Sequence, residues 1–115
     1  MIIKLNHLVI YLNTVNVVNQ SILKKFYRNN VTNMSGMFSE CSSLEELNLN
    51  NFNTNNVTDM SWMFSGCSSL KELNLNNFSI NKVTDMNGMF YRCSDELKIK
   101  IKSKFKYFRE EAFDD

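Results

Sequence analysis

The sequence predicts an α/β repeat protein: a right-handed solenoid with one parallel sheet on its concave side, short helices on its convex side and a cap at each end. The first observation is a period of 26 residues, because residues 31–56, 57–82 and 83–93 align position by position. A fixed period in this range is typical of stacked repeat arrays. A helical pattern and a strand pattern within each period are the other two observations.

The helical pattern lies in the first part of each period. Its apolar residues are spaced like one face of a helix with about 3.6 residues per turn, and Asp59 falls in the first turn after Thr58 or Asn56, either of which can cap it. We therefore expect a short helix over 59–64. The apolar residues of this pattern are Val57, Met60, Met63 and Phe64.

The strand pattern follows it. Leu73 and Leu75 alternate with polar residues, which is the period of a half-buried strand. We expect a strand over 72–75, and loops rich in asparagine and serine join it to the helices. One strand and one helical turn in each period make one coil of the predicted solenoid.

These positions resemble a known family. The segment NVTDMSWMFSGCSSLKELNLNNF is similar to the units of the BspA-like leucine-rich repeats, a group of bacterial and protist surface proteins. The resemblance covers residues 31–93. It implies a leucine-rich-repeat solenoid that binds proteins and, in some members, an adhesin that attaches to host or matrix proteins. It transfers no catalytic residue.

The chain is predicted to be one solenoid domain over residues 1–115, because it is short and its 43% apolar residues suffice for one continuous core. We expect it to be a monomer. The alignment gives a degenerate N-terminal capping repeat over 5–30, full repeats over 31–56 and 57–82, a partial repeat over 83–93 and a C-terminal helical cap over 94–115.

The N-terminal residues have a second interpretation, since Lys4 precedes an apolar run over 8–12 that is compatible with a signal peptide. The run is short, Asn13 interrupts it and no small-residue cleavage site follows, so we favour the capping repeat. No stretch is long enough to span a membrane, and we predict no membrane insertion. The localisation stays open: the resemblance implies the cell surface, whereas no signal peptide is visible.

Three cysteines, Cys41, Cys67 and Cys93, stand at the same position of successive periods. We favour a buried apolar role for them. A disulfide is one alternative, although an odd number leaves one thiol unpaired. Zinc is the other, but it needs a fourth ligand and the single histidine, His7, lies far from Cys41. We predict no metal and no cofactor.

Methionine and tryptophan allow a similar choice. Six of the seven methionines recur beside phenylalanine at helical spacing, which favours core filling over a contact surface. Trp62 stands where the flanking periods have Gly36 and Gly88. We expect it on the convex side, either as a hot spot for partner contact or packed across the space that the two glycines leave.

The predicted concave face is the candidate partner-binding site, because leucine-rich repeats commonly bind partners there. Its asparagines have an alternative role without a partner, in which they form hydrogen bonds to one another and to the backbone of turns. The two glutamates stack as like charges, so a cation or a basic partner is one hypothesis, and repacking of these long side chains into solvent is the alternative. The candidate residues are Glu46, Asn48, Asn50, Glu72, Asn74 and Asn76.

The repeat pattern ends at Ser94. The next apolar residues follow helical spacing, with Ser94 as N-cap and Asp95 in the first turn, so we favour a helix. A strand over 97–101 followed by a shorter helix is the alternative. We interpret the lysines here as a solvated face rather than a membrane or nucleic-acid patch. The apolar residues are Leu97, Ile101, Phe105, Phe108 and Ala112.

Charge and motifs bound the function. Residues 31–97 contain eight acidic and three basic residues, which argues against nucleic acid as a partner. With one histidine, no glycine-rich phosphate loop and no nucleophile beside a base, we predict no enzymatic activity. The sequence predicts a non-catalytic protein-binding module that acts in surface adhesion or recognition. The alternative is an intracellular interaction scaffold, or the repeat segment of a larger protein with a structural role.

Overall fold

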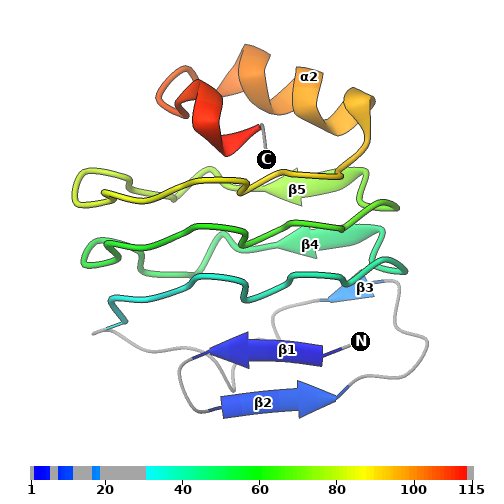
Figure 1. The fold of residues 1–115 in the computed structure, drawn as a ribbon, viewed down its shortest axis with the longest axis horizontal. Coiled ribbons are helices and arrows are strands. Elements are labelled where there is room, and N and C mark those ends of the chain that lie inside the picture. The colour runs from blue at the N-terminus through cyan, green and yellow to red at the C-terminus, as the bar shows by residue number, and fades with distance from the viewer. Residues whose placement is uncertain (1, 6–7, 12–16, 19–30, 114–115) are drawn as a thin grey trace.

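Two small sheets and a C-terminal helix make up the structure, a computed structural model that describes residues 2–5, 8–11, 17–18 and 31–113 (Figure 1). The first sheet is antiparallel and contains β1 (Ile2–Leu5) and β2 (Leu8–Tyr11). The second is parallel, and its strand order is β3 (Val17–Val18), β4 (Glu46–Asn48) and β5 (Glu72–Asn74). The helix α2 (Asp95–Lys104) and the 3-10 helix η2 (Glu110–Ala112) follow.

The parallel sheet pairs residues that stand 26 positions apart. Glu46 lies opposite Glu72, and Leu47 lies opposite Leu73. Alternate side chains of a strand point to opposite faces, so Leu47 is buried while the glutamates stay exposed. The strand predicted over 72–75 is confirmed, although β5 ends one residue earlier, at Asn74.

The short helix predicted over 59–64 is wrong. This segment is a turn, because alternate amide groups donate to the following segment, while the Met63 N–H donates to the Met60 carbonyl at 3.3 Å. The N–H of Met60 donates to the carbonyl of Asp85 at 2.9 Å, and the N–H of Phe64 donates to Met89 at 2.9 Å. The Asp59 carboxylate accepts from the Ser61 N–H at 2.9 Å, which is a turn-forming bond rather than a helix cap.

The predicted right-handed leucine-rich-repeat solenoid, with one parallel concave sheet and short convex helices, is therefore also wrong. Two separate sheets are present, one of them antiparallel, and the predicted convex helices are turns. The molecule measures 31 × 29 × 22 Å, and α2 is the one α-helix in the described part of the chain. It is a small compact unit. The alternation and spacing of apolar residues predicted what is buried, but not the backbone geometry that buries it.

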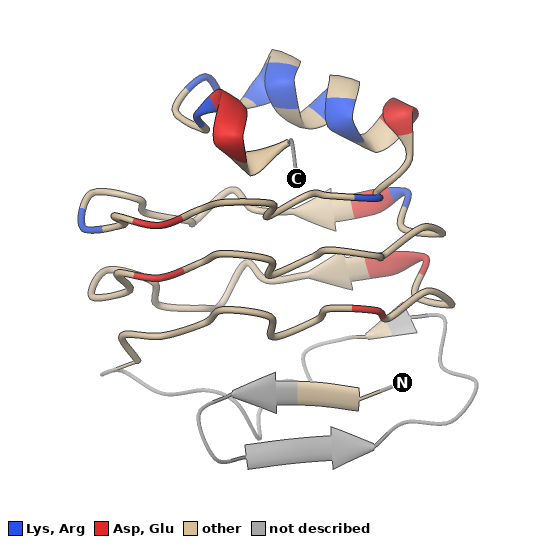
Figure 2. Ribbon diagram, in the orientation of Figure 1, with Lys and Arg blue, Asp and Glu red and all other residues tan. Residues whose placement is uncertain are grey.

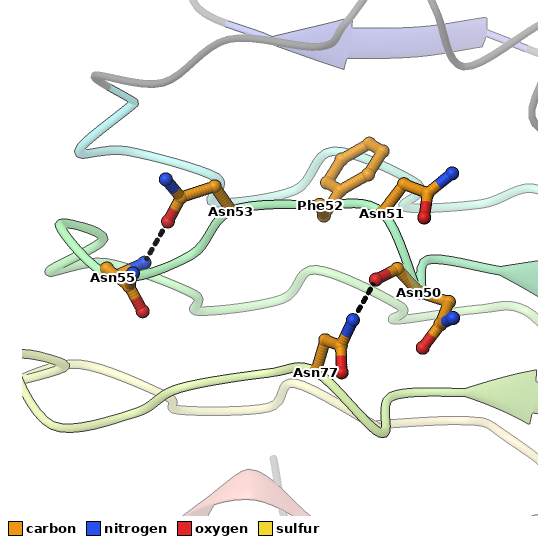
Figure 3. A pocket seen from close by; sticks show the side chains of 6 residues that line it. All are labelled: Asn50, Asn51, Phe52, Asn53, Asn55 and Asn77. Atoms are coloured by element: carbon orange, nitrogen blue, oxygen red, sulfur yellow. Dashed lines mark hydrogen bonds between the residues drawn. The ribbon is translucent and has the colours of Figure 1, made fainter.

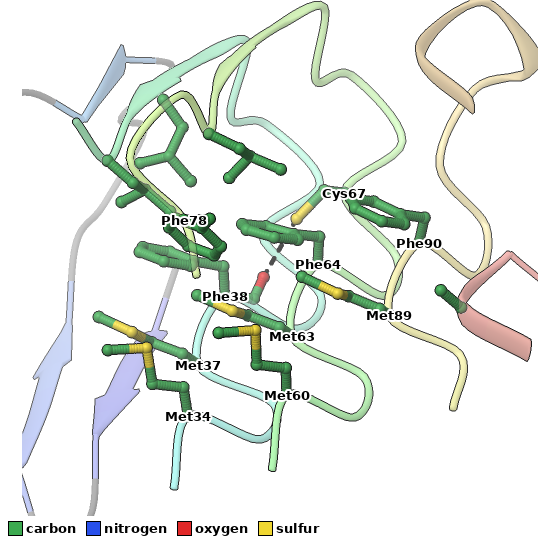
Figure 4. Close-up of a cluster of buried hydrophobic side chains, with 14 of the residues drawn as sticks. Met34, Met37, Phe38, Met60, Met63, Phe64, Cys67, Phe78, Met89 and Phe90 are labelled. Carbon is green, nitrogen blue, oxygen red and sulfur yellow. Dashed lines mark hydrogen bonds between the residues drawn. The ribbon is translucent and has the colours of Figure 1, made fainter. Parts of the chain in front are cut away.

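The core is a continuous apolar cluster in which the predicted interior positions meet. The six recurring methionines are all buried, so core filling is confirmed for them. Phenylalanine rings stack through the centre (Figure 4): the ring centroids of Phe38 and Phe64 are 5.8 Å apart, and those of Phe64 and Phe90 are 5.6 Å apart. Leu73 is an exception, since it is only partly buried at the margin of the cluster.

The C-terminal segment forms the favoured helix, and the alternative strand over 97–101 is wrong. Ser94 is the N-cap, and its hydroxyl accepts from the Leu97 N–H at 3.2 Å. The helix stops at Lys104, earlier than the apolar spacing predicts. Phe105 and Phe108 are nevertheless buried, because the chain turns back and places both rings against the core.

The N-terminal capping repeat predicted over 5–30 falls mostly outside the described residues. Within them, β3 continues the parallel sheet, with Val18 opposite Leu47. The sequence pattern does not predict the antiparallel pairing of β1 with β2.

Candidate functional site

The six candidate partner-binding residues gather on and beside one side of the parallel sheet, and we call them the polar row: Glu46, Asn48, Asn50, Glu72, Asn74 and Asn76. Each is exposed or half-buried. Glu46 lies opposite Glu72, and Asn48 lies opposite Asn74 in the β4–β5 pairing. Leu47 and Leu73 between them pack in or against the core, which sets the face on which the strands present these residues. The pairing thus brings Glu46 beside Glu72 and Asn48 beside Asn74, as expected, whereas the binding role of the six residues stays a prediction.

The two glutamates differ in their surroundings. Glu72 forms an ion pair with Lys100 of α2 at 3.8 Å, and Lys100 also contacts Glu96 at 3.5 Å. These side chains are about half exposed or more, so each pair contributes little to stability. Glu46 forms no ion pair with any residue that the structure describes. The expected cation is therefore partly supplied by the protein itself, and only at Glu72.

The asparagines of the polar row shape the turns that follow the strands. The Asn48 side-chain oxygen accepts from the Asn50 N–H at 2.9 Å, and the Asn74 oxygen accepts from the Asn76 N–H at 3.0 Å. Such bonds fix a turn locally. The side chain of Asn77 donates to the carbonyl of Asn50, which ties neighbouring turns together. The alternative role for asparagine, bonding to turn backbone, is thus confirmed for these contacts.

A shallow hollow of about 320 Å³ adjoins the polar row (Figure 3). Asparagines line most of it, and sequence reasoning singled out only part of this set. The run of asparagines in the sequence is the signal from which the rest of the lining could have been predicted. Among the described residues no charged side chain lines the hollow, which offers amide donors and acceptors. The lining residues are Asn50, Asn51, Phe52, Asn53, Asn55 and Asn77.

Trp62 lies away from the polar row. Its side chain is 40% exposed, and its ring meets Tyr91 edge-on with centroids 5.8 Å apart. The indole covers Gly88, whereas the space beside Gly36 is open. The packing interpretation is therefore confirmed on one side only, and the exposed remainder keeps Trp62 a candidate contact residue.

The three cysteines are buried free thiols, as the favoured interpretation predicts. Their sulfurs donate to backbone carbonyls: Cys67 to Phe38 at 3.2 Å and Cys93 to Phe64 at 3.2 Å. Burial raises the pKa of Cys93 to about 11. A thiol that stays protonated is a poor nucleophile and a poor metal ligand. Among the described residues, no three His, Cys, Asp or Glu side chains gather as a metal site.

The arrangement defines the class of the protein: a small unit with an interior of methionine and phenylalanine and a short parallel sheet that presents an acidic and amide-rich face. Comparison with known sequences then gives the family. The chain belongs to the family described as "Mycoplasma protein of unknown function, DUF285", whose sequence model matches residues 6–107. No curated protein and no solved structure matches the chain significantly. In the part of the chain that the structure describes, no helix has the length and apolarity to cross a bilayer.

Proposed function

We propose that this protein is a non-catalytic protein-binding module, related in its sequence units to BspA-like surface proteins, and that it holds its partner on the polar row. The observation that carries the proposal is the exposed carboxylate of Glu46, which lies in register with Glu72 and forms no ion pair with any described residue. Like charges opposite each other on a sheet cost stability. A basic group of a partner would relieve that cost at Glu46.

The geometry also suits recognition of a polypeptide. Asn48 and Asn74 keep amide groups at the ends of two strands held by the same sheet, and their turn-forming bonds hold the side chains in place. Pre-ordered side chains lose less entropy when they bind. The polar row thus combines two carboxylates with amide side chains that turn-forming hydrogen bonds hold in place.

Surface adhesion or recognition is the role we propose for this module, on the strength of the sequence resemblance. A second candidate is a structural or scaffolding role inside the cell. It is favoured by the contacts that the polar row makes within the protein, because Lys100 already pairs with Glu72 and the asparagines stabilise turns. Protease shaving and antibody labelling of intact source cells separate the two: exposure supports surface recognition, and strict protection supports the scaffold.

The binding face is tested with the variant Glu46→Gln, assayed by surface plasmon resonance against immobilised extracellular-matrix proteins. We expect the variant to bind the captured partner with an affinity about tenfold lower, which corresponds to about 1.4 kcal/mol of binding free energy. The matched control is Glu45→Gln, which removes the same charge from the neighbouring, half-buried position. Equal binding by both variants and the unaltered protein would remove the polar row from the interface.

A further inference from the structure

β5 is the last strand of the parallel sheet in the described residues, and beyond it lies α2 rather than another strand (Figure 1). The N–H of Glu72 donates to the Glu45 carbonyl at 3.2 Å, and the carbonyl of Asn74 accepts from the Leu49 N–H at 3.1 Å. Glu72 and Asn74 therefore direct their backbone groups toward β4. Alternate residues of a parallel strand bond to opposite neighbours, so the N–H and carbonyl of Leu73 face the other way. No strand pairs with β5 on that side within the described residues.

A hollow of about 290 Å³ lies at this edge, between β5 and α2. Leu73 lines it from the strand, and Ile101 and Phe105 line it from the helical side. Leu73 is only partly buried, in contrast to Leu47 at the equivalent place of β4, which is 2% exposed. The free backbone groups of Leu73 and a partly open apolar floor thus occur together.

The rim of the hollow is basic. Lys71, Lys100 and Lys104 line it together with a single carboxylate, that of Glu72. Lys100 is paired with Glu72 and Glu96, whereas Lys71 and Lys104 form no ion pair with the described carboxylates. Figure 2 shows several basic residues along α2 and an acidic residue at the start of β5. Two ammonium groups beside the free edge are therefore available to an anionic partner.

We propose that this groove binds an extended peptide segment rich in carboxylates, which adds a strand to the edge of β5. Addition of a strand uses the free N–H and carbonyl of Leu73, and the carboxylates of the peptide reach Lys71 and Lys104. The proposal rests on the proposed function only in that the ligand is a polypeptide. Glu72 belongs to both surfaces, but Glu46 belongs only to the polar row, and Lys71 and Lys104 belong only to the hollow, so the two surfaces can be tested separately.

The charge also decides between occupants. A second copy of this chain that pairs through its own β5 would bring an equal set of lysines against Lys71, Lys100 and Lys104, which is unfavourable. A nucleic acid would use the ammonium groups but has no backbone amides to continue a sheet. An acidic extended peptide satisfies both the free backbone groups and the free charges.

The primary test titrates the ¹⁵N-labelled protein with a blocked peptide of alternating valine and glutamate and, separately, with its valine and lysine counterpart. We expect the acidic peptide to bind at least about tenfold more tightly at low ionic strength. The Leu73 amide should shift most and exchange more slowly with solvent. A peptide whose central valine is N-methylated, and so cannot donate to the Leu73 carbonyl, should bind about tenfold more weakly.

Variants locate the site. Leu73→Pro removes the outward N–H without removing a β4–β5 bond, and proline is tolerated at such edge positions. It should lower the affinity for the acidic peptide about tenfold more than Leu73→Ala does, because Leu73→Ala retains the N–H. The pair Lys71→Gln and Lys104→Gln should abolish the preference for the acidic peptide, whereas the matched pair Lys98→Gln and Lys106→Gln, outside the hollow, should preserve it.

Several results would overturn the proposal. These are equal binding of the acidic and basic peptides, no effect of N-methylation, or dimers that form through β5 in sedimentation experiments. Binding of heparin with no competition by the acidic peptide would instead indicate a general polyanion surface, in which the lysines only protect the edge. Glu46→Gln should leave peptide binding unchanged, so loss of the polar-row function and loss of the groove give different results.

Discussion

The indole of Trp62 lies directly over the α-carbon of Gly88. A Cβ at Gly88 would stand 2.1 Å from the indole Cζ3 and 2.3 Å from Cε3. Gly36 stands at the equivalent position of an earlier 26-residue period. There the nearest atom to such a Cβ is 4.0 Å away, in Ser39. Both glycines have positive φ angles, +61° and +64°. The two positions share their backbone conformation and differ in the presence of a covering ring.

Gly88→Ala should therefore destabilise the protein more than Gly36→Ala. A left-handed conformation costs a residue with a Cβ about 1 to 2 kcal/mol, and both variants bear this cost. Gly88→Ala must also displace the indole, and we expect about 1 kcal/mol more from the lost ring contacts. Urea unfolding followed by circular dichroism measures the difference.

The control is the same pair of substitutions in a Trp62→Gly background. Removal of the ring should bring the cost of Gly88→Ala down to that of Gly36→Ala. Equal costs in the unaltered background would show that the indole contributes nothing to packing at Gly88, and would leave partner contact as the reason for its presence.

Thr54→Val should cost about 1 to 3 kcal/mol of unfolding free energy, because it leaves buried backbone groups without partners. Thr54 is 1% exposed. Its hydroxyl accepts a hydrogen bond from the Ser79 N–H at 2.8 Å and donates one to the Ser79 carbonyl at 3.2 Å. Chemical denaturation gives the value, and faster hydrogen exchange at the Ser79 amide should accompany it.

Thr58→Val is the matched control. Its hydroxyl also donates to a backbone carbonyl, that of Thr32 at 3.2 Å, but the residue is exposed and water can replace the bond. We expect a change within about 0.5 kcal/mol. A cost for Thr54→Val as small as that of the control would mean that the two bonds to Ser79 are not stabilising.

The sequence allows the buried positions to be predicted better than the backbone that carries them. Met60 and Phe64 are buried as their spacing requires. The same spacing does not form a helix, because the amides of these residues bond to Asp85 and Met89 in the next segment. Periodicity reports which side chains avoid water and contains no information on whether a hydrogen bond is local or distant.

The polar row shows the same division. Alternation around Leu47 was enough to place Glu46 and Asn48 outward, since a strand alternates its faces. The pairing of Glu72 with Lys100 was not predictable, because it depends on where α2 packs over the end of the sheet. That position is set by burial of Leu97 and Ile101, which is a tertiary contact.

Ser94→Ala should destabilise α2 by about 1 kcal/mol, since the hydroxyl of Ser94 caps the helix through the Leu97 N–H. Residues of α2 line one side of the hollow beside β5, so the variant should also lower the affinity for the acidic peptide. Ser103→Ala is the control for helix content only, because Ser103 lines the hollow. Its hydroxyl donates to the Lys100 carbonyl near the other end of the helix, where no N-terminal amide depends on it. Equal losses of helical signal in the two variants would argue against the cap.

The buried thiols should make the protein less stable at alkaline pH. Burial raises the pKa of Cys93 to about 11 and that of Cys41 to about 12, from an ordinary value of 9.0. Above pH 9.0 the unfolded chain loses thiol protons that the native state keeps, so the unfolded state is favoured as the pH rises. The effect is absent below about pH 8 and grows until the native thiols ionise themselves.

Unfolding by urea at pH 7.5, 9 and 10 under reducing conditions measures this dependence. At pH 10 the Cys93 thiol alone should lower the unfolding free energy by about 1 kcal/mol. Other groups also titrate in this range, so the comparison is with Cys93→Ala, which is less stable at pH 7.5 but should lose less stability between pH 7.5 and 10. An identical pH dependence in both proteins would mean that Cys93 is not held protonated by burial. Slow alkylation of the native thiols by iodoacetamide at pH 8, with rapid alkylation in urea, should accompany the expected result.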